Sequence, residues 1–290
     1  MNRQPFEKEK WESSLKSKGF FRSYGRDWGK VCGCNALLLF SNMIPFVIGL
    51  CMVMFLFPLI FPSFTPDGLR EYILNNGMAD AESATEDSVA NVYYMLCMLS
   101  SLMLSGMLLV VNGPFYSAVS FYFRNMLTGE DSLKKDLKQG LKDNWKQSIV
   151  VSLISIVITA VLLFNIGYYQ RADMGTMSLA AKSFFSVLLA FWCCMQLFIY
   201  PLIATVELSI KEIYRNATIM AVKNFPVAIG IFFLQIVLFL VIPFVAMLSF
   251  GQIGYAITML LYLLFSFGFI SYISMYITWK AIQKIIQNNG

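Results

Sequence analysis

Long uncharged apolar stretches alternate with shorter polar segments along the whole chain. A hydrocarbon layer of about 30 Å is crossed by roughly 20 helical residues, which is the length of these stretches. They therefore predict an all-α polytopic membrane protein with six transmembrane helices. We place the spans at Leu37–Pro58, Val92–Val111, Ser148–Phe164, Phe184–Ile203, Val227–Leu248 and Tyr255–Trp279.

The second uncharged stretch, residues 88–123, is too long for one upright span. Near its end lie Asn112, Gly113 and Pro114. Proline removes a helical hydrogen bond and glycine weakens the turn, so a kink or break is expected at this point.

Composition supports a membrane location. The chain is 58% hydrophobic and only 13% charged, whereas soluble domains carry about 25% charged residues. Among its partners we therefore expect the lipid bilayer and no nucleic acid.

Basic residues are divided unequally between the two sides of the predicted spans. Of the 22 Lys and Arg residues, 19 lie in segments 1–30, 124–147, 207–225 and 280–290, which six spans place on one side. Basic segments stay in the cytoplasm during insertion, so we expect cytoplasmic N and C termini in a bacterial plasma membrane. Residues 1–30 form an interfacial segment, 31–279 the membrane domain and 280–290 a tail. The 61–90 loop, acidic overall, faces outside.

Two cytoplasmic segments, 128–146 and 207–225, have the pattern of amphipathic connecting helices. In the first, Leu133, Leu137, Leu141 and Trp145 recur every four residues beside a row of lysines. Such helices either only join spans or bind lipid or a protein partner. The candidate contact residues are Lys134, Lys138, Lys142, Trp145, Lys211, Arg215 and Lys223.

Groups that perform catalysis are scarce. The chain has no histidine, and no Asp, Glu, Lys or Arg falls inside a predicted span, where ionisable side chains usually mark proton or ion pathways. The six cysteines lack the spacing of a zinc site. We predict no enzyme activity, no catalytic residues, no metal and no cofactor. Candidate intramembrane polar residues, for helix packing more than for substrate, are Asn112, Asn165, Gln196 and Gln235.

Several short motifs resemble the YesL family of bacterial integral membrane proteins, a domain of unknown function. They are Asn35-Ala-Leu-Leu with Pro45, Gly113-Pro114 with Ala118 and Arg124, Gly129-Glu130, Lys142 to Gln147, Tyr200-Pro201 to Glu207, Asn216-Ala217 and Asn224. One departure is the stretch of more than 60 residues, including the acidic loop, between Pro45 and Gly113.

The resemblance implies an accessory subunit or assembly factor of a carbohydrate ABC importer, in contact with its permease or ATPase subunits. Two alternatives stay open. The chain is a permease or facilitator in its own right, or it is a lipid-binding envelope protein that uses its basic inner side.

Overall fold

The structure is a computed structural model that describes residues 19–77, 80, 84–129, 131–172 and 174–288, with side chains up to residue 283. Within these residues the chain is helical and has no strand, which confirms the all-α class. The helices are α2 (Phe20–Ser41), α3 (Met43–Ile60), α4 (Pro66–Asn75), α5 (Glu86–Gly106), α6 (Gly113–Thr128), α7 (Leu133–Arg171), α8 (Thr176–Thr205), α9 (Ile210–Lys223), α10 (Phe225–Ile236), the π-helix η1 (Val237–Val241), α11 (Ile242–Leu261), the π-helix η2 (Tyr262–Ser266) and α12 (Phe267–Asn288).

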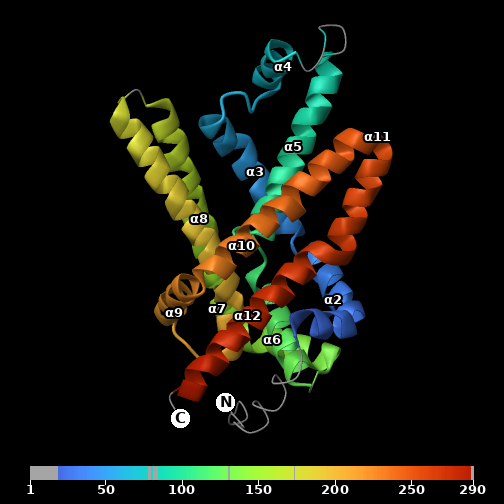
Figure 1. The fold of residues 1–290 in the computed structure, drawn as a ribbon, viewed down its shortest axis with the longest axis vertical. Helices are drawn as coiled ribbons and strands as arrows, with labels where there is room; N and C mark the ends of the chain where they lie inside the picture. The colour runs from blue at the N-terminus through green and yellow to red at the C-terminus, as the bar shows by residue number, and fades with distance from the viewer. Residues whose placement is uncertain (1–18, 78–79, 81–83, 130, 173, 289–290) are drawn as a thin grey trace.

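Five helical stretches of the described residues are long and apolar enough to cross a membrane, so the chain is a multi-pass helical membrane protein. They are Met43–Ile60, Glu86–Gly106, Leu133–Arg171, Thr176–Thr205 and Phe225–Gln283. The last stretch reverses direction at Gly251, whose φ of +51° suits glycine (Figure 1). Its two arms lie where the fifth and sixth spans are predicted, and the exact number of crossings stays a prediction.

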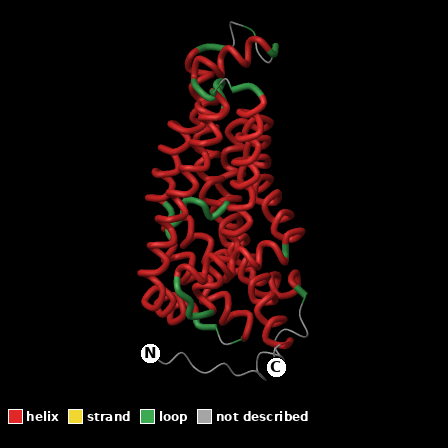
Figure 2. The backbone as a smooth tube through the Cα atoms, turned by 90° about the vertical axis from the view of Figure 1, so that its left-hand side faces the viewer, coloured by secondary structure: helices red, strands yellow, loops and turns green. Residues whose placement is uncertain are grey.

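The two ends of the molecule differ in charge and in packing. One end, called here the basic end, holds the start of α2, the α6–α7 connection, α9 and the end of α12, while α4 and the α7–α8 turn lie at the other (Figures 1 and 2). Toward the basic end, residues 192–204 of α8 are all buried. Residues 176–191 of the same helix are exposed or half-buried, so the helices separate toward the opposite end.

Two breaks between helices are held by polar side chains that pair backbone carbonyls. Pro45 cannot donate to the Ser41 carbonyl, which accepts instead from Asn112 Nδ2 at 3.0 Å. In the α5–α6 break, Val110 is outside any helix, and its carbonyl accepts from Ser105 Oγ at 2.9 Å. Backbone groups in lipid must be paired within the protein, so these bonds make the breaks possible.

The last hairpin shows the same arrangement. Pro243 follows η1, and the Phe239 carbonyl accepts from the Tyr262 hydroxyl at 2.8 Å. At η2, Asn35 of α2 donates to the carbonyls of Tyr262 and Leu263 and accepts from the backbone N–H of Gly268. One buried amide thus pairs three backbone groups of the last hairpin.

Two predicted spans need correction. The first, Leu37–Pro58, is divided at Asn42, which ends α2 and accepts from the Asn112 backbone N–H at 2.8 Å. Residues up to Ser41 belong to α2, which packs against η2 and α12. The predicted break near Asn112–Pro114 is confirmed, but it begins earlier, since α5 ends at Gly106 and residues 107–111 are buried and not helical.

Candidate functional site: the basic end

The seven predicted contact residues lie on α7 and α9 and all are exposed. We call them the basic face: Lys134, Lys138, Lys142 and Trp145 on α7, and Lys211, Arg215 and Lys223 on α9. The indole of Trp145 is 49% exposed, and Lys146 Nζ lies 5.8 Å from its ring centroid. The structure thus leaves these side chains free to meet another molecule.

The first predicted connecting helix, 128–146, is not a separate element. Gly129, with a φ of +84°, ends α6, and residues 133–146 are the first part of the 39-residue α7. The buried stripe is also not the leucine row. It consists of Asp136, Gly140, Asn144 and Ser148. At Gly140 the helix lies so close to α6 that an added Cβ would be 2.8 Å from the Ala118 backbone. Small residues permit this close approach.

The second predicted helix, 207–225, corresponds to α9, which begins with a capping box. Ser209 Oγ accepts from the Glu212 backbone N–H, and the Glu212 carboxylate accepts from the Ser209 backbone N–H at 2.8 Å. Ser209 Oγ also donates to this carboxylate at 2.7 Å, and this bond, together with the one from the Ser209 backbone N–H, lowers the pKa of Glu212. Its apolar face is buried as the pattern predicts, at Ile213, Ala217, Met220 and Ala221. The basic residues of α9 are therefore held on a firmly packed helix.

Helix α2 is joined to the basic end by an ion pair and an aromatic cluster. Lys30 Nζ lies 2.6 Å from Asp131 Oδ2, and the Tyr122 hydroxyl donates to the same oxygen at 3.3 Å. Burial acts to raise the pKa of Asp131, but the hydrogen bond and charge of Lys30 outweigh it and leave that pKa lowered.

The aromatic cluster belongs to the N-terminal segment, of which residues 1–18 lie outside the described part. The rings of Phe20 and Tyr24 are half-buried and pack on Tyr276 and Phe269 of α12 at centroid distances of 5.2 and 5.3 Å. Phe21, 85% exposed, remains available for an interface.

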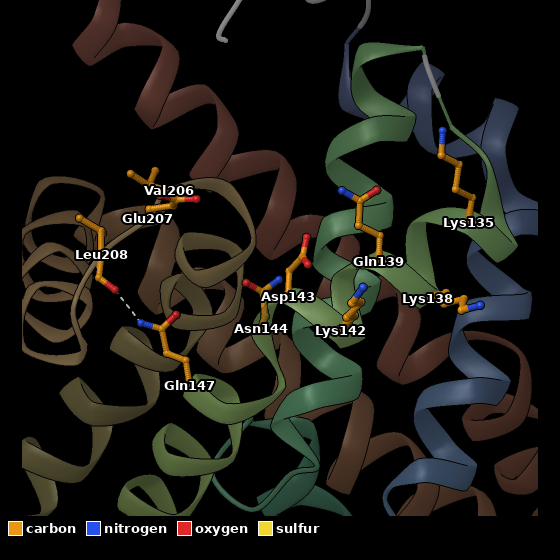
Figure 3. A pocket seen from close by; sticks show the side chains of 10 residues that line it. All are labelled: Lys135, Lys138, Gln139, Lys142, Asp143, Asn144, Gln147, Val206, Glu207 and Leu208. Carbon is orange, nitrogen blue, oxygen red and sulfur yellow. Dashed lines mark hydrogen bonds between the residues drawn. The ribbon is translucent and has the colours of Figure 1, made fainter. Parts of the chain in front are cut away.

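A cavity of about 730 Å³ lies between the first turns of α7 and the linker from α8 to α9 (Figure 3). We call it the lysine pocket. Its lining is Lys135, Lys138, Gln139, Lys142, Asp143, Asn144, Gln147, Val206, Glu207 and Leu208. Lys138 and Lys142 are shared with the basic face.

The linker that closes the pocket is fixed at both ends. Helix α8 ends at Thr205, and Arg124 of α6 donates to the Ala204 carbonyl at 2.9 Å. Gln147 Nε2 donates to the Leu208 carbonyl at 2.6 Å, the bond drawn in Figure 3. Val206 is extended, so the chain crosses the side of α7 before α9 begins.

The pocket lining contains three ammonium groups and two carboxylates. Lys135, Lys138 and Lys142 recur at intervals of three and four residues, which puts them along one side of α7. None of the three makes a hydrogen bond or ion pair with the described residues, and the same is true of Asp143. Glu207 differs from these four residues, because it already interacts with another group.

The four predicted intramembrane polar residues have different surroundings. Asn112 and Gln235 pair backbone groups at helix breaks, since Gln235 Nε2 donates to the Gly106 carbonyl at 3.0 Å. Asn165 is half-buried and donates to the Val161 carbonyl of its own helix. Gln196 is fully buried and accepts from Ser155 Oγ at 3.3 Å, while its Nε2 has no partner. Packing therefore accounts for most of these groups.

Gln196 belongs to a line of polar side chains between α7 and α8, which we call the polar seam. Its α7 members recur every three or four residues and its α8 members face them. They are Ser148, Ser152, Ser155 and Thr159 with Tyr200, Gln196 and Trp192. Ser152 Oγ also accepts from the Gly113 backbone N–H at 2.9 Å, which joins the seam to the start of α6.

Sequence reasoning did not find Lys135, Gln139, Asn144, Gln147 or Glu207 as pocket residues. Lys135 and Gln139 continue the lysine stripe at helical spacing, which is a usable signal. Glu207 comes from a linker whose position beside α7 has no local signature. In the described part of the chain, no group of three or more His, Cys, Asp or Glu side chains is placed to hold a metal.

Comparison with known proteins gives no relative. The chain matches no family model, no curated protein and no solved structure. The YesL resemblance therefore stays a prediction that rests on the motifs alone.

Proposed function

We propose that this membrane protein acts by binding and not by catalysis, as an accessory subunit or assembly factor of a carbohydrate ABC importer. The basic face is the observation that carries the proposal. Its side chains are exposed at one end, on two helices whose opposite faces are packed. A partner that presents acidic residues at the cytoplasmic side of the membrane fits this face. The importer itself is taken from the motif resemblance.

The separated helices at the other end supply a second surface for such a partner. Leu179, Phe184 and Val187 of α8 are each at least 60% exposed. They offer the permease spans an apolar contact within the bilayer. Contact through both surfaces would place the chain beside the permease and its ATPase together.

Affinity purification of the tagged chain from its native membrane, after crosslinking, tests the proposal. Importer subunits are expected to co-purify. The variant with Lys211, Arg215 and Lys223 all changed to Gln should recover much less of them. Lys182→Gln, which removes one charge at the opposite end, is the control. Recovery of the chain without any transporter subunit would refute the accessory role.

A permease is the second candidate, and the polar seam is the observation in its favour. The seam begins beside the lysine pocket, because Ser148 follows Gln147, and Thr159 lies 11 residues further along α7, about 16 Å into the membrane. Hydroxyl and amide groups of this kind bind neutral sugars without charge. Purified protein in liposomes should then pass oligosaccharides, and Gln196→Leu should stop the flux. An accessory protein alone should give no oligosaccharide flux.

A further inference from the structure

We propose that the lysine pocket binds a small soluble phosphate ester that also carries hydroxyl groups. This inference does not depend on the importer, because it concerns only the chain itself. A volume of about 730 Å³ falls in the range of roughly 300–1,000 Å³ typical of small-molecule sites. A single inorganic phosphate would leave most of this space unfilled.

The lysines indicate the phosphate. Lys135, Lys138 and Lys142 lie on one wall, are exposed, and have no partner among the described residues. Lysine binds phosphate as a point charge, and bonds between charged groups are the strong ones. Three unpaired ammonium groups beside one cavity therefore favour a dianionic group.

Asp143 indicates the remainder of the ligand. Its carboxylate lines the same cavity, unpaired among the described residues, and would repel a ligand that is anionic throughout. It accepts hydrogen bonds, and so does the carbonyl of Gln139, which also lines the cavity. Hydroxyl groups satisfy both acceptors. In Figure 3 Lys142 is the labelled lysine next to Asp143, so one ligand can meet both kinds of group.

Distance along α7 favours a soluble ligand over a lipid headgroup. Ile149 and Val150 are exposed apolar residues at the start of the third predicted span, where we expect the hydrocarbon layer to begin. At about 1.5 Å per residue, Lys142 lies roughly 10 Å and Lys135 roughly 21 Å from Ile149, whereas a headgroup layer is about 5–8 Å thick. A helix tilt of about 20° shortens these distances only slightly. A headgroup approaches Lys142 at most, and the other two lysines face water.

Bound ligand would join α7 to the α8–α9 linker. Gln147 already donates to the Leu208 carbonyl at the membrane side of the pocket. A phosphate ester that bridges the lysines and the linker would add a second connection further out.

Calorimetric titration of the purified full-length protein, in nanodiscs of zwitterionic lipid, tests the inference. The probes are glycerol phosphate, a hexose phosphate and inorganic phosphate. We expect saturable binding that weakens as salt is added, tighter for the hydroxylated esters than for inorganic phosphate. The variant with Lys138 and Lys142 changed to Gln should bind about a hundredfold more weakly, since it loses two charged bonds and each contributes about a factor of ten or more.

The control variant changes Lys211 and Lys223 to Gln, which removes the same charge from the same end outside the pocket, and it should keep the affinity within about twofold. Asp143→Asn should lower the preference for esters over inorganic phosphate. Absence of saturable binding, or equal loss in the control variant, would overturn the inference. So would binding seen only in nanodiscs of anionic lipid, which would assign the lysines to a headgroup. Co-purification of importer subunits is unaffected by these outcomes, so the two proposals fail separately.

Discussion

Removal of the Asn35 side chain should destabilise the whole fold, because this amide joins α2 to the last hairpin. Asn35 is fully buried and pairs the carbonyls of Tyr262 and Leu263 and the N–H of Gly268. A hydrogen bond between membrane helices contributes about 0.6 kcal/mol on average, and an unpaired buried group costs about 1–3 kcal/mol. For three bonds, Asn35→Ala should cost about 2 kcal/mol at the average membrane value, and up to about 9 kcal/mol if all three backbone groups stay unpaired.

The matched control is Asn165→Ala. Asn165 is also an asparagine in a span, but it is half-buried and bonds only to the Val161 carbonyl of its own helix. Its removal should cost less than about 0.5 kcal/mol, as for substitutions away from such networks. Unfolding of both variants by sodium dodecyl sulfate, followed by tryptophan fluorescence, gives the two values. Equal losses in the two variants would refute the role assigned to Asn35.

Three further predictions concern packing, pH and topology. Gly140→Ala should cost about 1–3 kcal/mol in the same unfolding assay, because the added Cβ meets the α6 backbone. Gly230 has open space around it, so Gly230→Ala should be neutral or slightly stabilising. The attachment of α2 through Lys30 and Asp131 should be complete above the ordinary carboxyl pKa of about 4 and lost as pH falls through the lowered pKa of Asp131. Fluorescence of labels on α2 and α6 would follow this loss, and a loss that sets in above pH 5 would contradict it. In intact cells that express the protein without its native cysteines, the Asn76→Cys variant should react with an impermeant maleimide. A variant with a cysteine at the basic end should not react. The reverse labelling pattern would overturn the predicted orientation.

Hydropathy and proline predict much of this fold, because both act locally. The apolar stretches appear as long helices, and Asn112–Pro114 shows as a break. The division at Asn42 was missed, since the Asn42 side chain holds it by accepting from a backbone N–H 70 residues away. A sequence pattern cannot show a bond between distant segments.

The orientation of α7 shows a second limit. The leucine row predicts an amphipathic helix but not which side packs on the rest of the protein, and the buried side holds Asp136, Gly140 and Asn144. Gly140 accounts for this side, because an added Cβ there would lie 2.8 Å from the Ala118 backbone of α6. The basic face was predictable because exposed charge needs no partner. The lysine pocket was not, because its second wall is the α8–α9 linker.

The paired breaks also have a consequence for biogenesis. The groups that Asn35 pairs lie more than 220 residues later in the chain and are synthesised long after it. The Gly106 carbonyl likewise lacks its partner until Gln235 has been made. At a synthesis rate of roughly 5–20 residues per second, that interval is about 10 to 45 s. During it, the Asn35 side-chain amide and the Gly106 carbonyl lack these partners, and lipid cannot replace them. The N-terminal half therefore needs a polar environment that can pair these groups, such as the lateral gate of the insertion machinery, until the final hairpin is inserted.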